Sequence, residues 1–278
     1  MQLPLKSKVL YLSMGDLFSR SEAMLGGAAM ARLAAARVLV VGVGGVGSWC
    51  AEALVRTGLG KITLVDDDVV AESNVNRQCP ATAATVGRAK VEAMAERLRA
   101  INPGCEIEAR FERFASGSSD SRSSSDSRIS SLARYDLVVD AIDSVDCKAE
   151  LILAATEAGV PVVSSMGAAL RLDPTKVKVT RFEKVEGDGL ARALRQRFKK
   201  LQRFPKGKFS CVWSGEAARG ALSPQAARTP LPLCEGYRTI EQSNNRTIPK
   251  GSLMQVTAVF GMCLASEAIR ILTKGEDK

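Results

Sequence analysis

The 278-residue sequence contains no histidine. Without that side chain, hydrolases with a histidine base, metal sites with imidazole ligands and imidazole-based pH switches are all excluded. Any catalysis must therefore use carboxylates, lysine, arginine, cysteine, backbone amides or a bound cation. The length allows one large domain or two small ones, and a hydrophobic content of 46% supplies a core.

Paired cysteines are also missing. The seven cysteines are scattered and form no CxxC pair, which argues against a disulfide framework and against a four-cysteine zinc site. The chain is therefore expected to be reduced and intracellular. If a covalent intermediate exists, Cys234 is the best placed thiol, although a buried structural cysteine is the commoner explanation.

Long apolar runs are absent as well. No run reaches the length of about twenty residues that a membrane span requires. The best candidate, residues 256–272, contains Glu267 and Arg270 and is interpreted as a buried helix, so no membrane span is expected.

Residues 1–16 are expected to be an N-terminal tail that makes a poor signal peptide. The expected location is the cytoplasm, and the sequence is also compatible with a mitochondrion or a plastid.

Short apolar runs alternate with helical segments along the first half of the chain. The expected strands are residues 37–43, 61–65, 105–111, 135–142 and 160–164. The expected helices are residues 20–36, 48–57, 88–100 and 148–158. This alternation predicts an α/β fold, a Rossmann-like, doubly wound, mostly parallel sheet with helices on both faces. Ten serines within residues 116–131 predict a disordered surface insert before the fourth strand.

The positive charge is concentrated in one segment. Residues 171–208 contain thirteen Lys or Arg and four Asp or Glu, so their net charge of +9 equals that of the whole chain. Residues 190–203 within it have the pattern of a basic amphipathic helix in a C-terminal extension. The charged side of such a helix often only faces water. Here, however, the whole surplus of positive charge lies in one segment, which favours a phosphate-rich ligand.

A glycine-rich turn follows the first expected strand. Residues 42–47 match G-x-G-x-x-G between a strand and a helix, with glycines at Gly42, Gly44, Gly45 and Gly47. Such glycines allow a tight turn whose backbone N–H groups approach phosphates at a helix N-terminus. Asp66, at the end of the second strand, is in place to hydrogen-bond ribose hydroxyls.

Further polar residues point to a triphosphate rather than to a dinucleotide. The turn and the helix suffice for a dinucleotide, whereas a triphosphate carries more charge for Arg77 and Lys90 to neutralise. Asn74 is expected to orient the α-phosphate. Asp143 follows the fourth strand, at the edge where such sheets bind ligands, and is the expected ligand of a Mg²⁺ ion that bridges phosphates. The alternative is surface salt bridges for Arg77 and Lys90 and a helix N-cap at Asp143.

These pieces together carry a family resemblance. The segments GVGGVGSWCAEALVRTGLGKITLVDDDVV, SNVNRQ, TVGRAK and DAIDSVDCK resemble the adenylating enzymes of the ThiF/MoeB type, which include ubiquitin-activating enzymes and activators of bacterial sulfur-carrier proteins. The resemblance implies a single adenylating domain over residues 17–271, with a C-terminal tail at 272–278. It implies catalytic roles for Arg77, Lys90 and Asp143. Arg20 would reach into the ATP site of a partner subunit. The implied nucleotide-binding residues are Gly42, Gly44, Gly45, Gly47, Asp66, Asp68, Ser73, Asn74, Arg77, Lys90, Asp143 and Ser144.

The second half resembles one branch of that superfamily, the tRNA threonylcarbamoyladenosine dehydratases. The resembling segments are GAALRLDPTKVKV, VTRFEKVEGDGLARAL, CVWSGE and GSLMQVTAVFGMCLAS. The resemblance implies ATP- and Mg²⁺-dependent cyclisation of threonylcarbamoyladenosine at position 37 of tRNA through an acyl-adenylate, with residues 171–250 binding the tRNA. It also implies a homodimer and, as in some relatives, a sulfur-relay protein as partner.

Other functions fit the sequence less well. A sulfur-carrier or ubiquitin-like adenylyltransferase fits the first half equally, but the missing zinc cysteines and the basic segment count against it. An NAD-dependent oxidoreductase would leave residues 73–78 and Lys90 without a role. A non-catalytic scaffold would be expected to have lost Arg77, Lys90 or Asp143.

Overall fold

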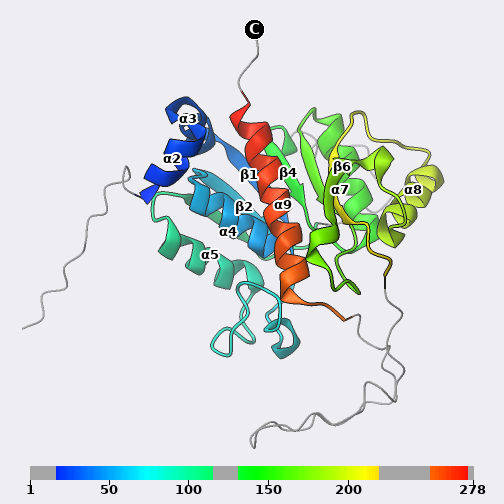
Figure 1. The fold of residues 1–278 in the computed structure, drawn as a ribbon, viewed down its shortest axis with the longest axis horizontal. Coiled ribbons are helices and arrows are strands. Elements are labelled where there is room, and N and C mark those ends of the chain that lie inside the picture. The colour runs from blue at the N-terminus through cyan, green and yellow to red at the C-terminus, as the bar shows by residue number, and fades with distance from the viewer. Residues whose placement is uncertain (1–16, 115–130, 219–250, 275–278) are drawn as a thin grey trace, which may run out of the picture.

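The computed structural model describes residues 17–114, 131–218 and 251–274 (Figure 1). The predicted N-terminal tail, Cys234 and all but the last residue of the Ser-rich insert lie outside these ranges. The helices are α2 (Ser19–Leu25), α3 (Gly27–Ala35), α4 (Gly47–Thr57), α5 (Lys90–Ile101), α7 (Val145–Glu157), α8 (Gly189–Leu201) and α9 (Met254–Thr273). The 3-10 helices are η1 (Glu72–Asn74), η2 (Pro174–Lys176) and η3 (Phe182–Lys184). The strands are β1 (Arg37–Val41), β2 (Lys61–Val65), β3 (Glu106–Arg110), β4 (Leu137–Asp140), β5 (Val162–Ser165), β6 (Val177–Arg181) and β7 (Ser210–Ser214).

The strands form one sheet in the order β3-β2-β1-β4-β5-β7-β6. Neighbouring strands are parallel except for β6 and β7, which pair antiparallel. This arrangement confirms the predicted doubly wound, mostly parallel fold. The sequence pattern does not predict β6, because its residues are largely exposed and its place is fixed only by pairing with β7. The chain order reverses between β1 and β4, so a topological switch point lies at the carboxyl ends of these two strands.

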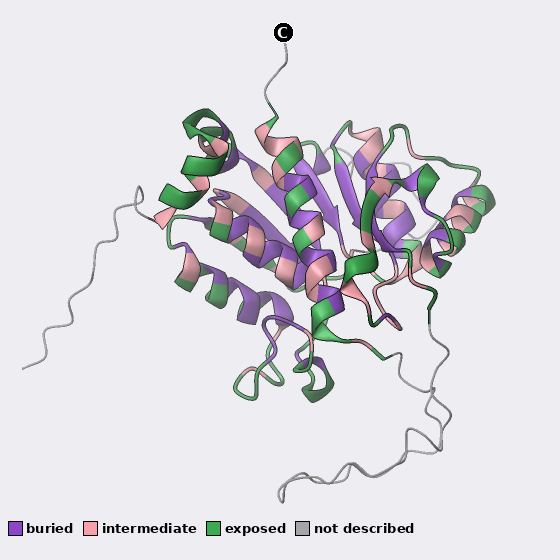
Figure 2. Cartoon of the chain, viewed as in Figure 1, coloured by how far each residue is buried: buried purple, intermediate pink, exposed green. Residues whose placement is uncertain are grey.

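Helices cover both faces of the sheet (Figure 2). Side chains of a strand alternate between the two faces. Val38 and Val40 of β1 belong to the core under α3, α4, α5 and α9, whereas Leu39 and Val41 belong to the core under α7 and α8. A strand buried on both faces is mostly apolar, which is why the RVLVV run is recognisable from the sequence.

Residues 20–36, expected to be one helix, form α2 and α3, because Gly26 between them has a φ of 80°, a left-handed conformation that glycine adopts without strain.

Among the described helices, α9 alone has the length and composition of a membrane span. Its side chains Val256, Phe260 and Leu264 are nevertheless buried in the core, and α9 crosses one face of the sheet (Figure 1). We therefore interpret α9 as a core helix.

The predicted basic helix is confirmed as α8. Its N-cap is Asp188, whose Oδ1 accepts a hydrogen bond from the Ala191 backbone at 2.9 Å. Leu194 and Phe198 are buried against α7 and the sheet, and basic side chains occupy the exposed face. Asp188 therefore fixes where the helix begins, while the apolar stripe fixes which face is turned to solvent.

Candidate active site

A pocket of about 770 Å³ opens at the switch point. It is lined by residues that follow β1, β2, β4 and β5 and by the first turn of α8. The predicted nucleotide-binding residues that line it are Gly42, Gly44, Gly45, Asp66, Asp68, Asn74, Arg77, Lys90, Asp143 and Ser144. The structure thus brings together segments that are up to about a hundred residues apart in the chain, at the edge where open α/β sheets bind ligands.

The glycine turn packs tightly against the loop after β4. Gly42 has a φ of 91°, and a Cβ atom at this position would lie 2.7 Å from the Ala141 carbonyl oxygen. A Cβ atom on Gly47 would overlap the Gly42 carbonyl oxygen, so Gly47 shapes the turn without lining the pocket. At Gly45 the Arg77 side chain lies 3.4 Å from the Cβ position. The glycines therefore allow two loops and an arginine to converge on one small volume.

Asp66 links the end of β2 to the glycine turn. Its Oδ2 accepts a hydrogen bond from the Val43 backbone at 2.6 Å, and its Oδ1 accepts one from Asp68 at 2.9 Å. Burial nevertheless raises the pKa of Asp66, because it outweighs these hydrogen bonds and the nearby charge of Lys90. The carboxylate thus holds the turn in shape while lining the pocket.

Lys90 is the most buried cation of the predicted nucleotide site. It is the first residue of α5 and is 5% exposed. Its Nζ lies 2.6 Å from Oδ2 of Asp68, whose side chain is 67% exposed. The ammonium group is therefore fixed at the pocket wall by a carboxylate that faces water.

Arg77 is held at the pocket by its own loop. Its Nη1 donates to the Ser73 carbonyl at 2.8 Å and to Oδ1 of Asn76 at 2.9 Å, and its own carbonyl accepts from Trp49 Nε1 at 3.0 Å. Ser73 is exposed and does not line the pocket, so it supports the arginine through its backbone. Asn74 is buried, and its Oδ1 accepts from the Ala71 backbone at 3.0 Å.

The loop that carries Arg77 is anchored to α4 from behind. The Cys79 backbone donates to Ser48 Oγ at 3.2 Å, and its Sγ donates to Glu52 Oε2 at 2.8 Å. Burial opposes ionisation of Glu52, but hydrogen bonds from Arg97, Cys79 and Arg56 outweigh it and lower the pKa of Glu52 to about 2. Burial raises the pKa of Cys79 to about 12, so this cysteine is a structural thiol.

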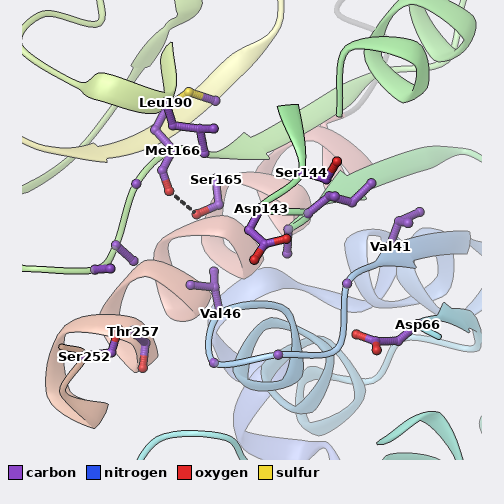
Figure 3. Close-up of a pocket in the computed structure, with 18 of the residues that line it drawn as sticks. Val41, Val46, Asp66, Asp143, Ser144, Ser165, Met166, Leu190, Ser252 and Thr257 are labelled. Atoms are coloured by element: carbon purple, nitrogen blue, oxygen red, sulfur yellow. Dashed lines mark hydrogen bonds between the residues drawn. The ribbon is translucent and has the colours of Figure 1, made fainter. Parts of the chain in front are cut away.

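Asp143 stands in the pocket on the loop after β4 (Figure 3). It is exposed and makes no hydrogen bond or ion pair with the described part of the chain. The same loop is fixed by Asp140, whose Oδ1 accepts from the Ile142 backbone at 3.2 Å. Oδ2 of Asp140 accepts from Lys148 Nζ and from Ser164 Oγ, both at 2.6 Å, and all three side chains are fully buried. A buried ion pair thus orients the loop and leaves Asp143 free.

One cluster of carboxylates and one single carboxylate at the pocket could hold a metal ion. Asp66, Asp67 and Asp68 have oxygens within 4.8 Å of one another, but Asp68 is already paired with Lys90. Asp143 is a single unpaired carboxylate, which fits a Mg²⁺ ion that takes its remaining ligands from phosphates and water. The chemistry of this carboxylate therefore fits the predicted assignment of Asp143 as a Mg²⁺ ligand.

Some residues fall outside the predictions. Arg20 is exposed on α2 and does not line the pocket of its own chain. Conversely, the pocket is lined by Arg171 and Asp188, both buried, which the sequence did not mark as site residues. Two signals were present: an isolated arginine in the apolar run GAALRLDP, and an aspartate at the N-cap position of the basic helix.

Comparisons with known proteins agree with this geometry. The sequence profile of the ThiF family matches residues 18–278. The tRNA threonylcarbamoyladenosine dehydratase of Escherichia coli K12 is 38% identical over 260 residues, covering 91% of this chain and 92% of the relative. The Haemophilus influenzae protein of the same name is 35% identical and covers 88% of both chains. The crystal structure of the E. coli dehydratase in complex with ATP matches with a TM-score of 0.75 and 36% identity, covering 93% of this chain and 94% of that one.

Proposed function

The chain belongs to the ThiF family, and we propose that it is an ATP-dependent tRNA threonylcarbamoyladenosine dehydratase. The observation that carries the proposal is the coverage of the likeness. The two dehydratases compared above match 91% and 88% of this chain, the family profile spans the segment with α8, and the dehydratase solved with ATP has the same fold. The enzyme would cyclise threonylcarbamoyladenosine at position 37 of tRNA with net loss of water. Such an enzyme works where tRNA is modified, which is the cytoplasm, a mitochondrion or a plastid.

The first chemical step needs no general base. The threonyl carboxylate is already ionised, and one of its oxygens attacks the α-phosphorus of ATP while the bond to pyrophosphate breaks. Arg77, Lys90 and the N–H groups of the glycine turn would neutralise the phosphate charge, which is the main contribution a protein makes to phosphoryl transfer. Phosphate oxygens would replace Asp68 as the partner of Lys90, because Asp68 is mostly exposed and can turn to water.

The second step is intramolecular. The neighbouring carbamoyl group attacks the activated acyl carbon and loses an N–H proton to water, while the acyl–oxygen bond breaks and AMP leaves, which closes the ring. Proximity within one substrate favours this step, and no enzyme thiol is needed. Consistent with this, burial raises the pKa of the Cys50, Cys79 and Cys211 thiols. Asp143 would hold a Mg²⁺ ion, which supplies positive charge to the phosphates when bound.

The exposed face of α8 supports tRNA binding. Arg192, Lys199 and Lys200 are exposed and form no ion pair with the described residues. In contrast, Arg195 donates to the Phe182 and Val185 carbonyls at 2.9 and 2.7 Å, so it holds the helix in place. We therefore assign Arg192, Lys199 and Lys200 to contacts with tRNA phosphates.

This assignment is tested by salt dependence. The double variant Lys199→Ala and Lys200→Ala should weaken tRNA binding and reduce the slope of log Kd against log salt by about 2, one for each phosphate contact. Lys206→Ala is the matched control, because Lys206 is already paired with Glu157 at 2.8 Å. Equal effects of the two variants would remove the assignment.

We also propose that the protein forms a homodimer. Arg20 would enter the ATP site of the second copy, as the family resemblance implies. In support, α2 has no buried residue, and Met24 on this helix is 85% exposed. A large apolar side chain in water favours an interface. A sulfur-relay protein is a further proposed partner, on the resemblance alone.

The proposed function is tested by release of pyrophosphate from ATP. We expect release with tRNA that carries threonylcarbamoyladenosine, and none with tRNA that lacks it, with a ubiquitin-like carrier or with no addition. Mass spectrometry of the digested tRNA should show loss of one water from the modified nucleoside. Activation by the carrier protein alone would contradict the proposal and favour a sulfur-carrier adenylyltransferase.

A further inference from the structure

We propose that Arg171 binds the ionised carboxylate of the threonylcarbamoyl group and so selects the modified tRNA before adenylation. The proposal rests on the proposed function and names the side chain that recognises its substrate. Arg171 lines the pocket and is only 3% exposed. Its Nε and Nη1 are buried without a hydrogen-bond partner among the described residues. Buried polar groups are normally hydrogen-bonded, so a guanidinium with two unpartnered nitrogens at a pocket marks a ligand site.

The neighbouring acid does not satisfy this arginine. Nη2 of Arg171 lies 3.6 Å from Oδ2 of Asp188, which is too long for a hydrogen bond. Asp188 instead accepts from the Ala191 backbone at 2.9 Å and from the Gly167 backbone at 3.2 Å. The N-terminus of α8 stabilises its negative charge further. Asp188 thus lies beside Arg171 but leaves the hydrogen-bonding capacity of the guanidinium for an anion.

The backbone around Arg171 is held in a defined conformation. Leu170 has a φ of 62°, an unusual conformation for a bulky residue that persists only where surrounding contacts impose it. Its N–H donates to the Gly251 carbonyl at 2.8 Å, and on the other side the Leu172 N–H donates to Glu216 Oε2 at 3.0 Å. The arginine is therefore fixed from both sides, as recognition of a small group requires.

The position of Arg171 suits the first chemical step. β4 and β5 are neighbours in the sheet, with Asp140 paired to Ser164. Asp143 follows β4 and Arg171 lies on the loop that follows β5, and both line the same pocket. A carboxylate held by Arg171 would thus lie beside the nucleotide part of the pocket. Adenylation turns that carboxylate into an uncharged acyl group, which weakens its hold on the guanidinium and frees the acyl carbon for ring closure.

The test compares Arg171→Met and Arg171→Lys with the matched control Arg195→Met in the full-length protein. Affinities are measured without ATP for tRNA carrying threonylcarbamoyladenosine and for the same tRNA with unmodified adenosine, and the ATP affinity is measured separately. Arg171→Met should lose about tenfold or more in affinity for the modified tRNA. It should retain the affinity for unmodified tRNA and for ATP. Arg171→Lys should recover part of the loss, because it keeps the charge.

The three affinity measurements show which anion Arg171 binds: the threonyl carboxylate, a tRNA backbone phosphate or a phosphate of ATP. An equal loss with both tRNAs would assign Arg171 to a backbone phosphate, and a loss of ATP affinity would assign it to the nucleotide; either result overturns the proposal. Arg195→Met should lower the thermal midpoint without changing the preference between the tRNAs. The wild type could convert the modified tRNA while Arg171→Lys and Arg171→Met still prefer modified over unmodified tRNA as strongly as wild type. In that case only the role of Arg171 fails. If wild type neither prefers nor converts that tRNA, the proposed function fails as well.

Discussion

Glu52 offers a quantitative test of how the ATP pocket is supported. It is buried under the loop that carries Arg77, and it accepts hydrogen bonds from Cys79, Arg97 and Arg56. These contacts lower its pKa from an ordinary value of 4.5 to about 2. A carboxyl group with a lowered pKa in the folded protein stabilises the fold above its unfolded pKa, and this contribution is lost as the pH falls towards the folded pKa.

The magnitude follows from the two pKa values. The difference corresponds to about 3 kcal/mol of unfolding free energy at neutral pH. Of this amount, roughly 2 kcal/mol is lost between pH 7 and pH 3, because the unfolded state takes up a proton there and the folded state does not. Glu52→Gln removes the titrating group and should remove this pH-dependent part. The variant should also bind ATP more weakly, since the loop of Arg77 loses an anchor.

The assay is urea unfolding of wild type and Glu52→Gln at several pH values from 7 to 3. The difference in unfolding free energy between the two proteins should shrink by roughly 2 kcal/mol over this range. Glu96→Gln is the matched control, because Glu96 is 69% exposed and paired with Arg88 at the surface, where such pairs contribute about 0–1 kcal/mol. A difference between wild type and Glu52→Gln that stays constant with pH would refute the reasoning.

Three further predictions concern the pocket. Lys90→Ala and Asp143→Ala should each reduce ATP-dependent turnover by about 100-fold or more while the thermal midpoint shows that the protein stays folded; normal turnover in either would break the assignment. Lys148→Met should destabilise the fold by about 3–5 kcal/mol in urea unfolding, since it leaves the buried Asp140 without its ion-pair partner, and adding Asp140→Asn should recover part of this loss. Gly42→Ala should cost about 1–3 kcal/mol through its left-handed φ and weaken ATP binding in a titration; unchanged affinity would show that the turn tolerates a side chain.

The sequence predicts the fold well where burial dictates residue type. β1 and β2 are mostly apolar because both of their faces are covered, and the predicted 61–65 strand coincides with β2. The break at Gly26 is missed, because glycine is tolerated inside a helical pattern and the sequence does not show that this glycine adopts a positive φ. β6 is missed for a different reason. Its residues are mostly exposed, and pairing with β7 alone makes them a strand.

The nucleotide half of the site is more predictable than the substrate half. Gly42, Asp66 and Asp143 each follow a strand at a position that the alternating pattern already marks, so their convergence follows from the parallel topology. Arg171 lies in a loop between β5 and β6, and nothing local shows that it is buried. Its proximity to Asp188 depends on how α8 packs against the sheet, which is a tertiary contact between segments with no common periodicity.

Three buried carboxylates in the described part of the chain have the same role, which is to hold a loop of the pocket. Asp140 fixes the loop of Asp143, Glu52 fixes the loop of Arg77, and Asp188 fixes the loop before Arg171. Each buried carboxylate accepts a hydrogen bond from the loop it supports. Replacement by an apolar residue could preserve packing there, but it would remove the directional contact that sets the loop. In a chain without histidine, the proposed chemistry relies on positioned fixed charges rather than on a titrating base, so the contacts that hold these charges in place must be rigid.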